Sequence, residues 1–331
     1  MQLSTVVELP VKKLTITHKS NLLLLGSCFS NNIGAKLVER KFVADVNPFG
    51  ILYNPISIAT ALNRIIDGTP FDENSQELQY HQERWHSMLH HGDFSHAECS
   101  QMLLMVNNRL LSAHDGVEHC DVVMITFGTS YVYRRLSDNL VVGNCHKLPA
   151  NMFSRELLSV TAIVDTMHVA IEHLLRVAPK AKVLFTVSPI RHLRDGAHDN
   201  QISKSTLLIA IDELCRHFPQ STIYFPAYEI MLDELRDYRF YADDMLHPSS
   251  LAVEYIWECF GRCFFDNATE TLNRDIEVIN RALLHRPFDD SSKAYYGFIE
   301  ETKCKIGKII EKNPHLDFVK EISKCNTILN R

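Results

Sequence analysis

One stretch decides the fold of this chain: Leu22-Leu23-Leu24-Leu25-Gly26-Ser27-Cys28-Phe29-Ser30-Asn31. Four consecutive leucines predict a short buried strand, and the polar residues after Gly26 predict a turn followed by the start of a helix. Ser27 would then stand between a strand and a helix, with its hydroxyl near the positive end of the helix dipole. We therefore expect Ser27 to be a nucleophile.

Short apolar runs of the same kind recur along the chain. Strands are expected at 21–25, 42–46, 121–127, 182–187 and 222–225. Amphipathic helices are expected between them at about 30–40, 56–67, 96–114, 155–178 and 201–217, with a closing helix at 249–265. Strands that are apolar throughout are typical of a parallel sheet covered by helices on both faces. The fold class is therefore α/β.

Polar clusters follow the predicted strands. The carboxyl ends of parallel strands share one edge of a sheet, where open α/β sheets hold their ligands. These clusters contain Ser27, Gly50, Thr129, Ser130, Arg191, His192 and, before the closing helix, His247. If each cluster had only a local structural role, there would be no reason for all of them to lie at the same edge. We therefore expect a single functional site there.

The remaining segments are insertions and an appendage. Residues 68–95 form an irregular segment rich in histidine, and residues 131–142 predict a hairpin. From about residue 270 the chain is helix-like and rich in lysine and glutamate. We expect a catalytic domain over 1–268, with the histidine-rich insertion near 68–95, and a helical C-terminal extension over 269–331.

Composition argues against several classes of function. Lys and Arg number 34 against 40 Asp and Glu, and no basic run occurs, so nucleic acid is not an expected partner. No apolar run approaches the roughly 20 residues of a membrane span, and the four leucines are too few for the about 7–15 apolar residues of a signal peptide. Nine cysteines without a CxxC pair predict reduced thiols. We expect a cytoplasmic protein.

A serine hydroxyl needs a base before it can attack a carbonyl carbon. Asp244 and His247 are of the right types, because a carboxylate can hold an imidazole in the tautomer that accepts a proton. The same spacing also suits a pair that only caps the following helix. Candidate oxyanion donors are the amides of Ser27 and Gly50, with a third donor expected after the strand that ends at Phe127.

Cys28 competes with Ser27 for the role of nucleophile. A thiolate is intrinsically the better nucleophile, and a helix N-terminus lowers the pKa of a thiol. Neighbouring side chains at a sharp turn point apart, so only one of the two can face the site. We expect Ser27 to face it and Cys28 to pack beneath the turn.

Further polar residues are candidates for substrate binding. Arg191 and His192 follow a strand and can orient a polar or anionic substrate. Asn144 and His146 lie in a polar loop, in which His146 is a reserve base. The alternative for that loop is a set of turn hydrogen bonds.

The histidine-rich insertion offers both pocket and metal candidates. Trp85 and His86 either line the rim of the pocket, where their faces suit sugar rings or aromatic acyl groups, or belong to the core. His86 and His90 have the i, i+4 spacing of a helical metal pair, but no acidic or cysteine partner stands at a diagnostic spacing. We therefore expect no metal.

Together these motifs resemble a known family. Gly26-Ser27-Cys28-Phe29 is similar to the signature of the GSCFA-domain family, a branch that resembles the SGNH/GDSL hydrolases. The resemblance covers about 22–260 and includes the blocks 47–55, 127–129, 144–147, 188–192, 236–241 and 244–248. Residues 270–331 lie outside it.

The resemblance implies a fold and a set of roles. The fold is a three-layer α/β/α sandwich similar to flavodoxin, in agreement with the alternation of strands and helices. Ser27 would be the nucleophile, Gly50 the oxyanion glycine, and Asp244 and His247 the DxxH pair. No cofactor is implied.

One block departs from the family pattern. The third SGNH block usually reads Gly-x-Asn-Asp, and its asparagine donates to the oxyanion, whereas Ser130 takes that place here. The replacement donor would be Thr129, Ser130, Asn54 or Asn144.

The sequence thus predicts a serine ester hydrolase that acts on small O-acyl esters, O-acetylated carbohydrates among them, through an acyl-serine intermediate. The alternatives are an O-acyltransferase that uses the same residues and a catalytically silent ligand-binding domain. The expected partner is a small-molecule or carbohydrate ester.

Overall fold

The centre of the molecule is a five-stranded sheet in which all pairings are parallel. The computed structural model describes residues 5–11 and 14–330. The strand order is β10-β9-β5-β1-β2. The bounds are β1 (Asn21–Gly26), β2 (Val43–Val46), β5 (Val122–Phe127), β9 (Lys182–Val187) and β10 (Thr222–Tyr224). The predicted parallel sheet is confirmed.

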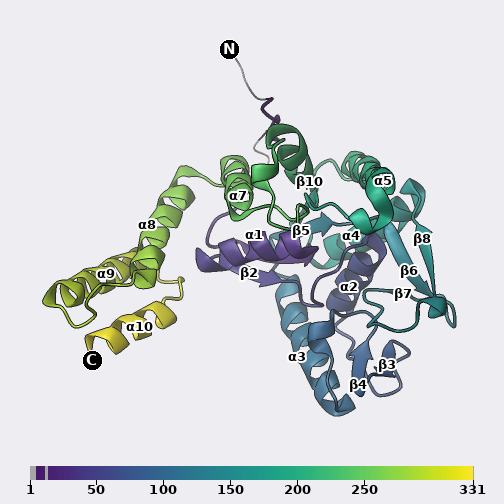
Figure 1. Ribbon diagram of the computed structural model, residues 1–331, viewed down its shortest axis with the longest axis horizontal. Helices are drawn as coiled ribbons and strands as arrows, with labels where there is room; N and C mark the ends of the chain where they lie inside the picture. Colours follow the sequence, from purple (N-terminus) through teal and green to yellow (C-terminus); the bar gives the residue numbers. More distant parts are fainter. Residues whose placement is uncertain (1–4, 12–13, 331) are drawn as a thin grey trace.

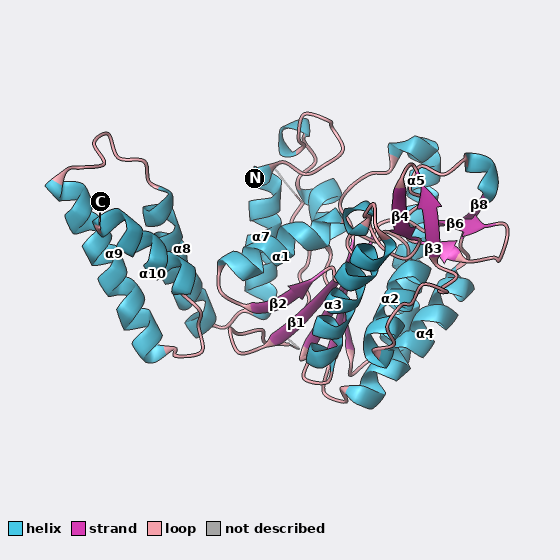
Figure 2. Cartoon of the chain, turned by 90° about the horizontal axis from the view of Figure 1, so that it is seen from below, coloured by secondary structure: helices cyan, strands magenta, loops and turns pink. Residues whose placement is uncertain are grey.

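Helices cover both faces of this sheet and complete three layers (Figure 2). One face carries α1 (Cys28–Glu39) and α7 (Ser250–Phe264). The other carries α2 (Pro55–Asp67), α3 (Cys99–Val117), α4 (Val160–Val177) and α5 (Gly196–His217). Side chains alternate along β1, so Leu22 and Leu24 pack toward α1 while Leu23 and Leu25 pack toward α2. This explains why all four residues from Leu22 to Leu25 must be apolar.

The direction in which successive strands are added to the sheet changes between β1 and β5. The chain runs outward from β1 to β2, and then crosses to the other side of β1 to build β5, β9 and β10 in turn. The loops that leave β1 and β5 therefore separate, and a crevice between such loops is where open α/β sheets bind ligands. Ser27 and Gly128 lie directly at this point.

A second, antiparallel sheet follows β5. It pairs β6 (Tyr131–Arg135) with both β7 (Val141–Val142) and β8 (Phe153–Leu157). The predicted hairpin is confirmed, but the helix expected to begin at about residue 155 begins at Val160. Residues 153–157 instead pair with β6, where an ion pair between Arg134 and Glu156 adds a cross-strand contact.

The histidine-rich insertion contains a short hairpin of β3 (Leu78–His81) and β4 (Arg84–Ser87). The remaining short turns of helix are η1 (Gly92–Phe94), η2 (Ala150–Met152), η3 (Leu193–Asp195), α6 (Ala227–Glu229), the π-helical η4 (Ile230–Glu234) and η5 (Tyr238–Phe240).

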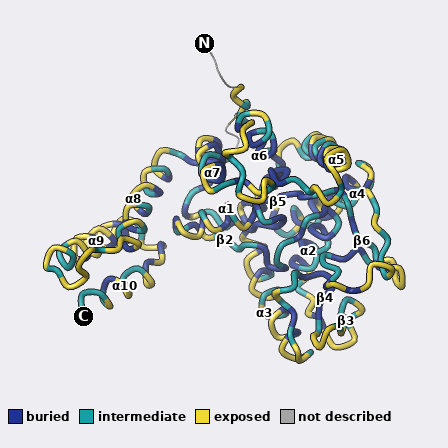
Figure 3. The backbone as a smooth tube through the Cα atoms, in the orientation of Figure 1, coloured by how far each residue is buried: buried dark blue, intermediate teal, exposed yellow. Residues whose placement is uncertain are grey.

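Three C-terminal helices stand apart from the α/β body (Figure 1). They are α8 (Asn267–Leu284), α9 (Lys293–Lys312) and α10 (Val319–Leu329). They enclose an apolar core of their own, which includes Ile276, Ile299, Ile306 and Phe318, while much of the outer face of α9 is exposed (Figure 3). None of the helices in the described part of the chain is long and apolar enough to cross a membrane.

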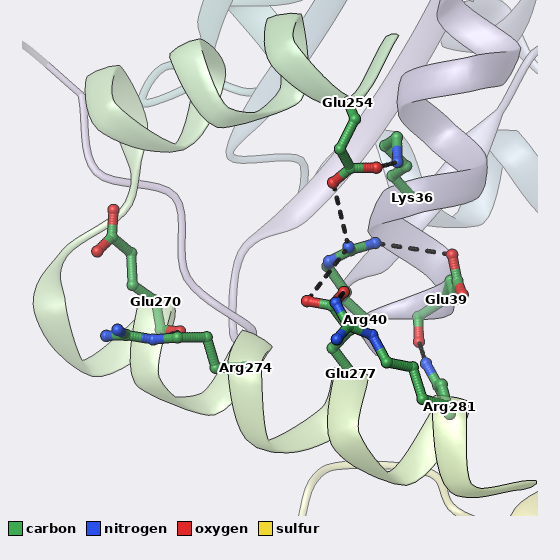
Figure 4. A network of polar contacts seen from close by, with 9 residues as sticks. Lys36, Glu39, Arg40, Glu254, Glu270, Arg274, Glu277 and Arg281 are labelled. Atoms are coloured by element: carbon green, nitrogen blue, oxygen red, sulfur yellow. Dashed lines mark hydrogen bonds and ion pairs between the residues drawn. The ribbon is translucent and has the colours of Figure 1, made fainter. Parts of the chain in front are cut away.

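Charged groups join these helices to the body (Figure 4). Arg40 at the end of α1 lies between Glu254 of α7 and Glu277 of α8, at 3.8 and 3.9 Å. Its guanidinium also stacks over the ring of Trp257, 5.0 Å from the ring centroid. Lys41 pairs with Glu321 of α10 at 2.6 Å. The junction is therefore largely polar.

Candidate functional site

The turn between β1 and α1 is shaped by Gly26. This residue has φ +141°, a backbone conformation that residues other than glycine rarely adopt. A Cβ atom there would lie 2.3 Å from the carbonyl oxygen of Thr126 on β5. The Gly26 amide donates to Asn47 Oδ1 at 2.8 Å. The turn thus holds Ser27 and Cys28 against the neighbouring strand with little freedom.

Ser27 lies beneath this turn. Its residue exposure is 1%, and its Oγ accepts a hydrogen bond from the Phe29 amide at 3.3 Å, which makes it the N-cap of α1. Its own amide donates to the Thr126 carbonyl at 3.3 Å. The hydroxyl predicted to be the nucleophile thus serves as a helix cap in this structure.

Cys28 is the partly exposed member of the pair. Cys28 was expected to be the more buried of the two, but it is partly exposed, whereas Ser27 is buried. Burial raises the pKa of the Cys28 thiol, whereas the amides of Cys28 and Phe29 and the charge on Lys204 act to lower it. The thiol therefore lies at the positive end of α1 and within the electrostatic reach of a lysine.

That lysine, Lys204 on α5, is a site residue that the sequence reasoning missed. It is 0% exposed, and its Nζ donates to the carbonyl oxygens of Gly128 at 2.7 Å and Ser188 at 2.8 Å. It thereby joins the carboxyl ends of β5 and β9. Burial lowers the pKa of Lys204 to about 7. Within the described residues no carboxylate forms an ion pair with Lys204; its charge faces the two carbonyl oxygens and the ring of Tyr228, whose centroid lies 5.6 Å from Nζ.

A signal for Lys204 did exist in the sequence. It precedes Leu207, Ile211 and Leu214 at helical spacing, and all three are buried. A lysine on the apolar stripe of a helix is costly to bury and marks a position with a specific partner.

His192 and Arg191 follow β9, as predicted. The His192 ring meets the ring of Tyr53 edge-on, with centroids 5.6 Å apart. Burial, helped by the positive charges of Lys204 and His247, lowers the pKa of His192 to about 4, so the ring is neutral near pH 7. Its Nε2 is buried and has no hydrogen-bond partner within the described chain. The guanidinium of Arg191 lies 5.7 Å from the ring centroid of Tyr241.

Asp244 and His247 form the predicted pair. Asp244 Oδ2 lies 2.5 Å from His247 Nδ1, and Oδ1 accepts the amides of Leu246 and His247, each at 2.9 Å. These contacts lower the pKa of Asp244 to about 2. Both side chains are about half exposed, at 47% and 49%. The carboxylate therefore fixes the orientation of the ring. The N-cap of α7 is Ser249, so neither Asp244 nor His247 caps that helix.

The predicted oxyanion donors are already bonded within the protein. The Gly50 amide donates to the Asn47 carbonyl at 2.7 Å, and the Thr129 amide donates to the Tyr53 carbonyl at 3.1 Å. Ser130 is 0% exposed, and its amide donates to Ser203 Oγ at 2.8 Å. These groups hold the loops in place.

The two asparagine candidates also bond within loops. Asn54 caps α2, since its Oδ1 accepts the Ser57 amide at 2.8 Å and its Nδ2 donates to Ser57 Oγ at 2.9 Å. Asn144 Oδ1 accepts the His146 amide at 2.9 Å. Asn54 is therefore committed to the start of a helix.

The insertion residues contact one another. The rings of His86 and His146 stack with centroids 4.5 Å apart. His86 bonds to Ser95 Oγ at 2.6 Å, and His146 Nε2 bonds to the Ser87 carbonyl at 2.9 Å. Trp85 packs against Tyr80, with ring centroids 5.3 Å apart. For these residues the structure shows the contacts of a local core.

No group of three or more histidine, cysteine or acidic side chains is arranged to hold a metal ion in the part of the chain that the structure describes.

Comparison with known proteins adds the family. The GSCFA family model matches residues 21–260, which includes every element of the α/β body from β1 to most of α7. A second model, of the C-terminal domain of GSCFA domain proteins, matches residues 276–331, a segment that the sequence resemblance left out. No curated protein shows a significant match. The chain therefore belongs to the GSCFA family.

Proposed function

We propose that this protein hydrolyses small O-acyl esters through an acyl-enzyme formed on the turn between β1 and α1. His247 acts as the general base, and Asp244 orients it. The observation that carries the proposal is the Asp244–His247 pair, in which one carboxylate holds the ring nitrogen and two amides of the same loop.

The pair and the turn share one edge of the sheet. The charge of His247 lowers the pKa of His192, and the charge of Lys204 does so as well. Lys204 in turn acts on the pKa of Cys28 at the turn. The base and the turn therefore act electrostatically on the same intermediate group of residues, His192 and Lys204.

The ionisation of the pair suits general base catalysis. With its pKa lowered to about 2, Asp244 is a carboxylate at neutral pH. A carboxylate at Nδ1 favours the tautomer that carries its proton there, which leaves Nε2 to accept a proton from the nucleophile. General base assistance of this kind contributes about 10²–10⁴ in rate.

The reaction then proceeds in two halves. His247 Nε2 takes the proton of the nucleophile as the nucleophile attacks the ester carbonyl carbon. The imidazolium returns that proton to the departing alcohol, and the acyl group stays on the enzyme. Water then attacks the acyl-enzyme with the same base, and the carboxylic acid leaves. Charge on the carbonyl oxygen is stabilised by the positive end of α1, to which the Cys28 amide belongs.

Two features support a small, polar substrate. Arg191 lies over the ring of Tyr241, in the same loop as the pair, and both can contact hydroxyl or carbonyl groups. The likeness of the motifs to SGNH hydrolases supports esters, including O-acetylated carbohydrates, at the level of family analogy.

The test is turnover of p-nitrophenyl acetate by the wild type and by His247→Ala. We expect the variant to lose activity by roughly 10³-fold, within the range for a general base. The matched control is His119→Ala, an exposed histidine outside the catalytic edge, which should keep wild-type activity. Equal loss in both variants, or unchanged turnover in His247→Ala, would refute the proposal. Turnover that rises strongly with added sugar would identify an acyltransferase instead.

A further inference from the structure

Two adjacent side chains at the β1–α1 turn can be the nucleophile, and they differ in what surrounds them. Ser27 is 1% exposed and caps α1 through the Phe29 amide. Cys28 is partly exposed and begins the helix. We propose that Cys28 Sγ is the nucleophile of the site, and that the buried ammonium of Lys204 stabilises the thiolate as it forms. This inference rests on the proposed ester hydrolysis.

The position of Ser27 argues against an attack by its hydroxyl. The hydroxyl would have to leave the N-cap and rotate out of a turn that Gly26 and Asn47 hold in place. Loss of the N-cap would destabilise the start of α1. Cys28 needs no such rearrangement, because it is partly exposed and does not serve as the N-cap of α1.

Lys204 gives Cys28 a partner that a structural cysteine would not need. It is fully buried between two carbonyl oxygens, at 2.7 and 2.8 Å, and forms no ion pair within the described residues. A buried ammonium is costly unless an anion forms beside it. Its nitrogen has three donors and the two carbonyls use two, which leaves one for the reacting groups.

Two more polar atoms at this edge are free to bond a substrate. Ser188 is 0% exposed, and its Oγ is buried without a hydrogen-bond partner among the described residues. His192 Nε2 is likewise buried without a hydrogen-bond partner among the described residues. Both follow β9, whose end is tied to Lys204 through the Ser188 carbonyl. Buried polar atoms are rarely left unbonded, so these two support a ligand at the same place.

The resting thiol is protonated at neutral pH, because burial raises its pKa. Cys28 therefore needs a base. The titratable groups that surround the site are Lys204 on α5, Tyr53 and His192 in loops, and the Asp244–His247 pair.

The bonds and protons of the reaction balance. His247 Nε2 takes the thiol proton while Sγ bonds to the ester carbonyl carbon. The C–O bond to the alcohol then breaks, and the alcohol leaves with that proton. His247 next takes a proton from water, whose oxygen bonds to the acyl carbon. The C–S bond breaks, the carboxylic acid departs, and the proton returns to sulfur.

The experiment maps the acyl group. The full-length protein is mixed with p-nitrophenyl acetate, quenched in acid within one turnover and digested, and the acetylated residue is identified by mass spectrometry. We expect acetyl on Cys28 as a thioester that hydroxylamine releases. Cys28→Ala should lose at least about 10³-fold in turnover, whereas Ser27→Gly, which largely preserves the cap, should lose less than tenfold.

A second measurement tests Lys204. Iodoacetamide should inactivate the enzyme by alkylating Cys28, and the matched control Cys304→Ser removes the exposed thiol without altering inactivation. In Lys204→Met, alkylation of Cys28 near pH 7, where part of the wild-type Lys204 still carries its proton, should be slower, because the nearby positive charge is gone.

The outcomes separate the two proposals. Acetyl on Ser27 with an active Cys28→Ala variant overturns the cysteine assignment and leaves ester hydrolysis standing. An unchanged rate of Cys28 alkylation near pH 7 in Lys204→Met overturns the role of the lysine. A wild-type protein that neither turns over nor becomes acylated overturns ester hydrolysis, and the cysteine assignment with it.

Discussion

Two regions of very different exposure meet at the carboxyl edge of the sheet. The first is the sheet edge proper, which holds Gly26, Cys28, His192 and Lys204 on short turns and on α5. The second is the loop 241–248, whose Asp244 and His247 side chains are 47% and 49% exposed. Arg191 connects them, because it stacks on Tyr241 of the loop.

Different forces control ionisation in the two regions. At the sheet edge, burial is the largest cause of the altered pKa of Cys28, His192 and Lys204. In the loop, hydrogen bonds lower the pKa of Asp244, and burial opposes them. Substitutions in the loop should therefore change catalysis with little effect on stability, whereas substitutions at the sheet edge should change both.

The largest expected effect belongs to the loop. Asp244→Asn should lower kcat for p-nitrophenyl acetate by roughly 10³-fold, because an amide cannot fix the productive tautomer of His247. The urea midpoint should stay close to that of the wild type. The matched control is Asp243→Asn at the neighbouring exposed position, which should retain activity. A large fall in the urea midpoint of Asp244→Asn would contradict the separation between the two regions.

A substitution at the sheet edge should lower the free energy of unfolding. Gly26→Ala places a Cβ 2.3 Å from a backbone oxygen at a φ of +141°, and we expect a loss of about 3 kcal/mol of unfolding free energy. Gly297→Ala is the matched control, because a Cβ there meets nothing within 4 Å inside α9. It should gain about 0.5–1 kcal/mol from helix propensity. Urea denaturation measures both, and a loss in Gly26→Ala smaller than 1 kcal/mol would show that the turn can relax.

The same contrast explains what the sequence could predict. The five strands of the parallel sheet were predictable to within one residue, because a parallel sheet buried on both faces favours runs that are largely apolar. The Asp244–His247 contact was predictable as well, because three residues of chain cannot separate the two side chains by much. Both predictions depend on local sequence alone.

The sheet edge depends on contacts between distant segments, and there the sequence was less informative. The choice between Ser27 and Cys28 follows from backbone angles that β5 imposes on Gly26, and residue types alone do not encode them. Lys204 reaches the edge from α5, and the apolar stripe that marks it as buried does not tell which strand ends it joins. The pairing of 153–157 with β6 was missed for the same reason, since a strand partner acts from outside the segment.

The stability contributed by Lys204 should depend on pH. Its pKa is about 7 when folded and 10.5 in its ordinary state, so between these values the unfolded chain binds more protons than the folded one. Stability therefore rises with pH in this range. Between pH 7 and pH 9 the wild type should gain about 2 kcal/mol relative to Lys204→Met. Urea denaturation of both proteins at the two values measures this, and a difference that stays constant with pH would mean that Lys204 keeps its proton in the folded state.

The smallest expected effect returns to the loop. Met245 is 51% exposed and has φ +58°, the left-handed region that asparagine tolerates better than methionine. Met245→Asn should raise stability by about 0.5 kcal/mol and change turnover less than twofold, because the Asp244 contacts that orient His247 are kept. Thermal unfolding and p-nitrophenyl acetate turnover check both parts. A large loss of activity would show that the methionine side chain itself contacts the substrate. In that case the exposure of a residue in this loop would not tell whether it takes part in the reaction.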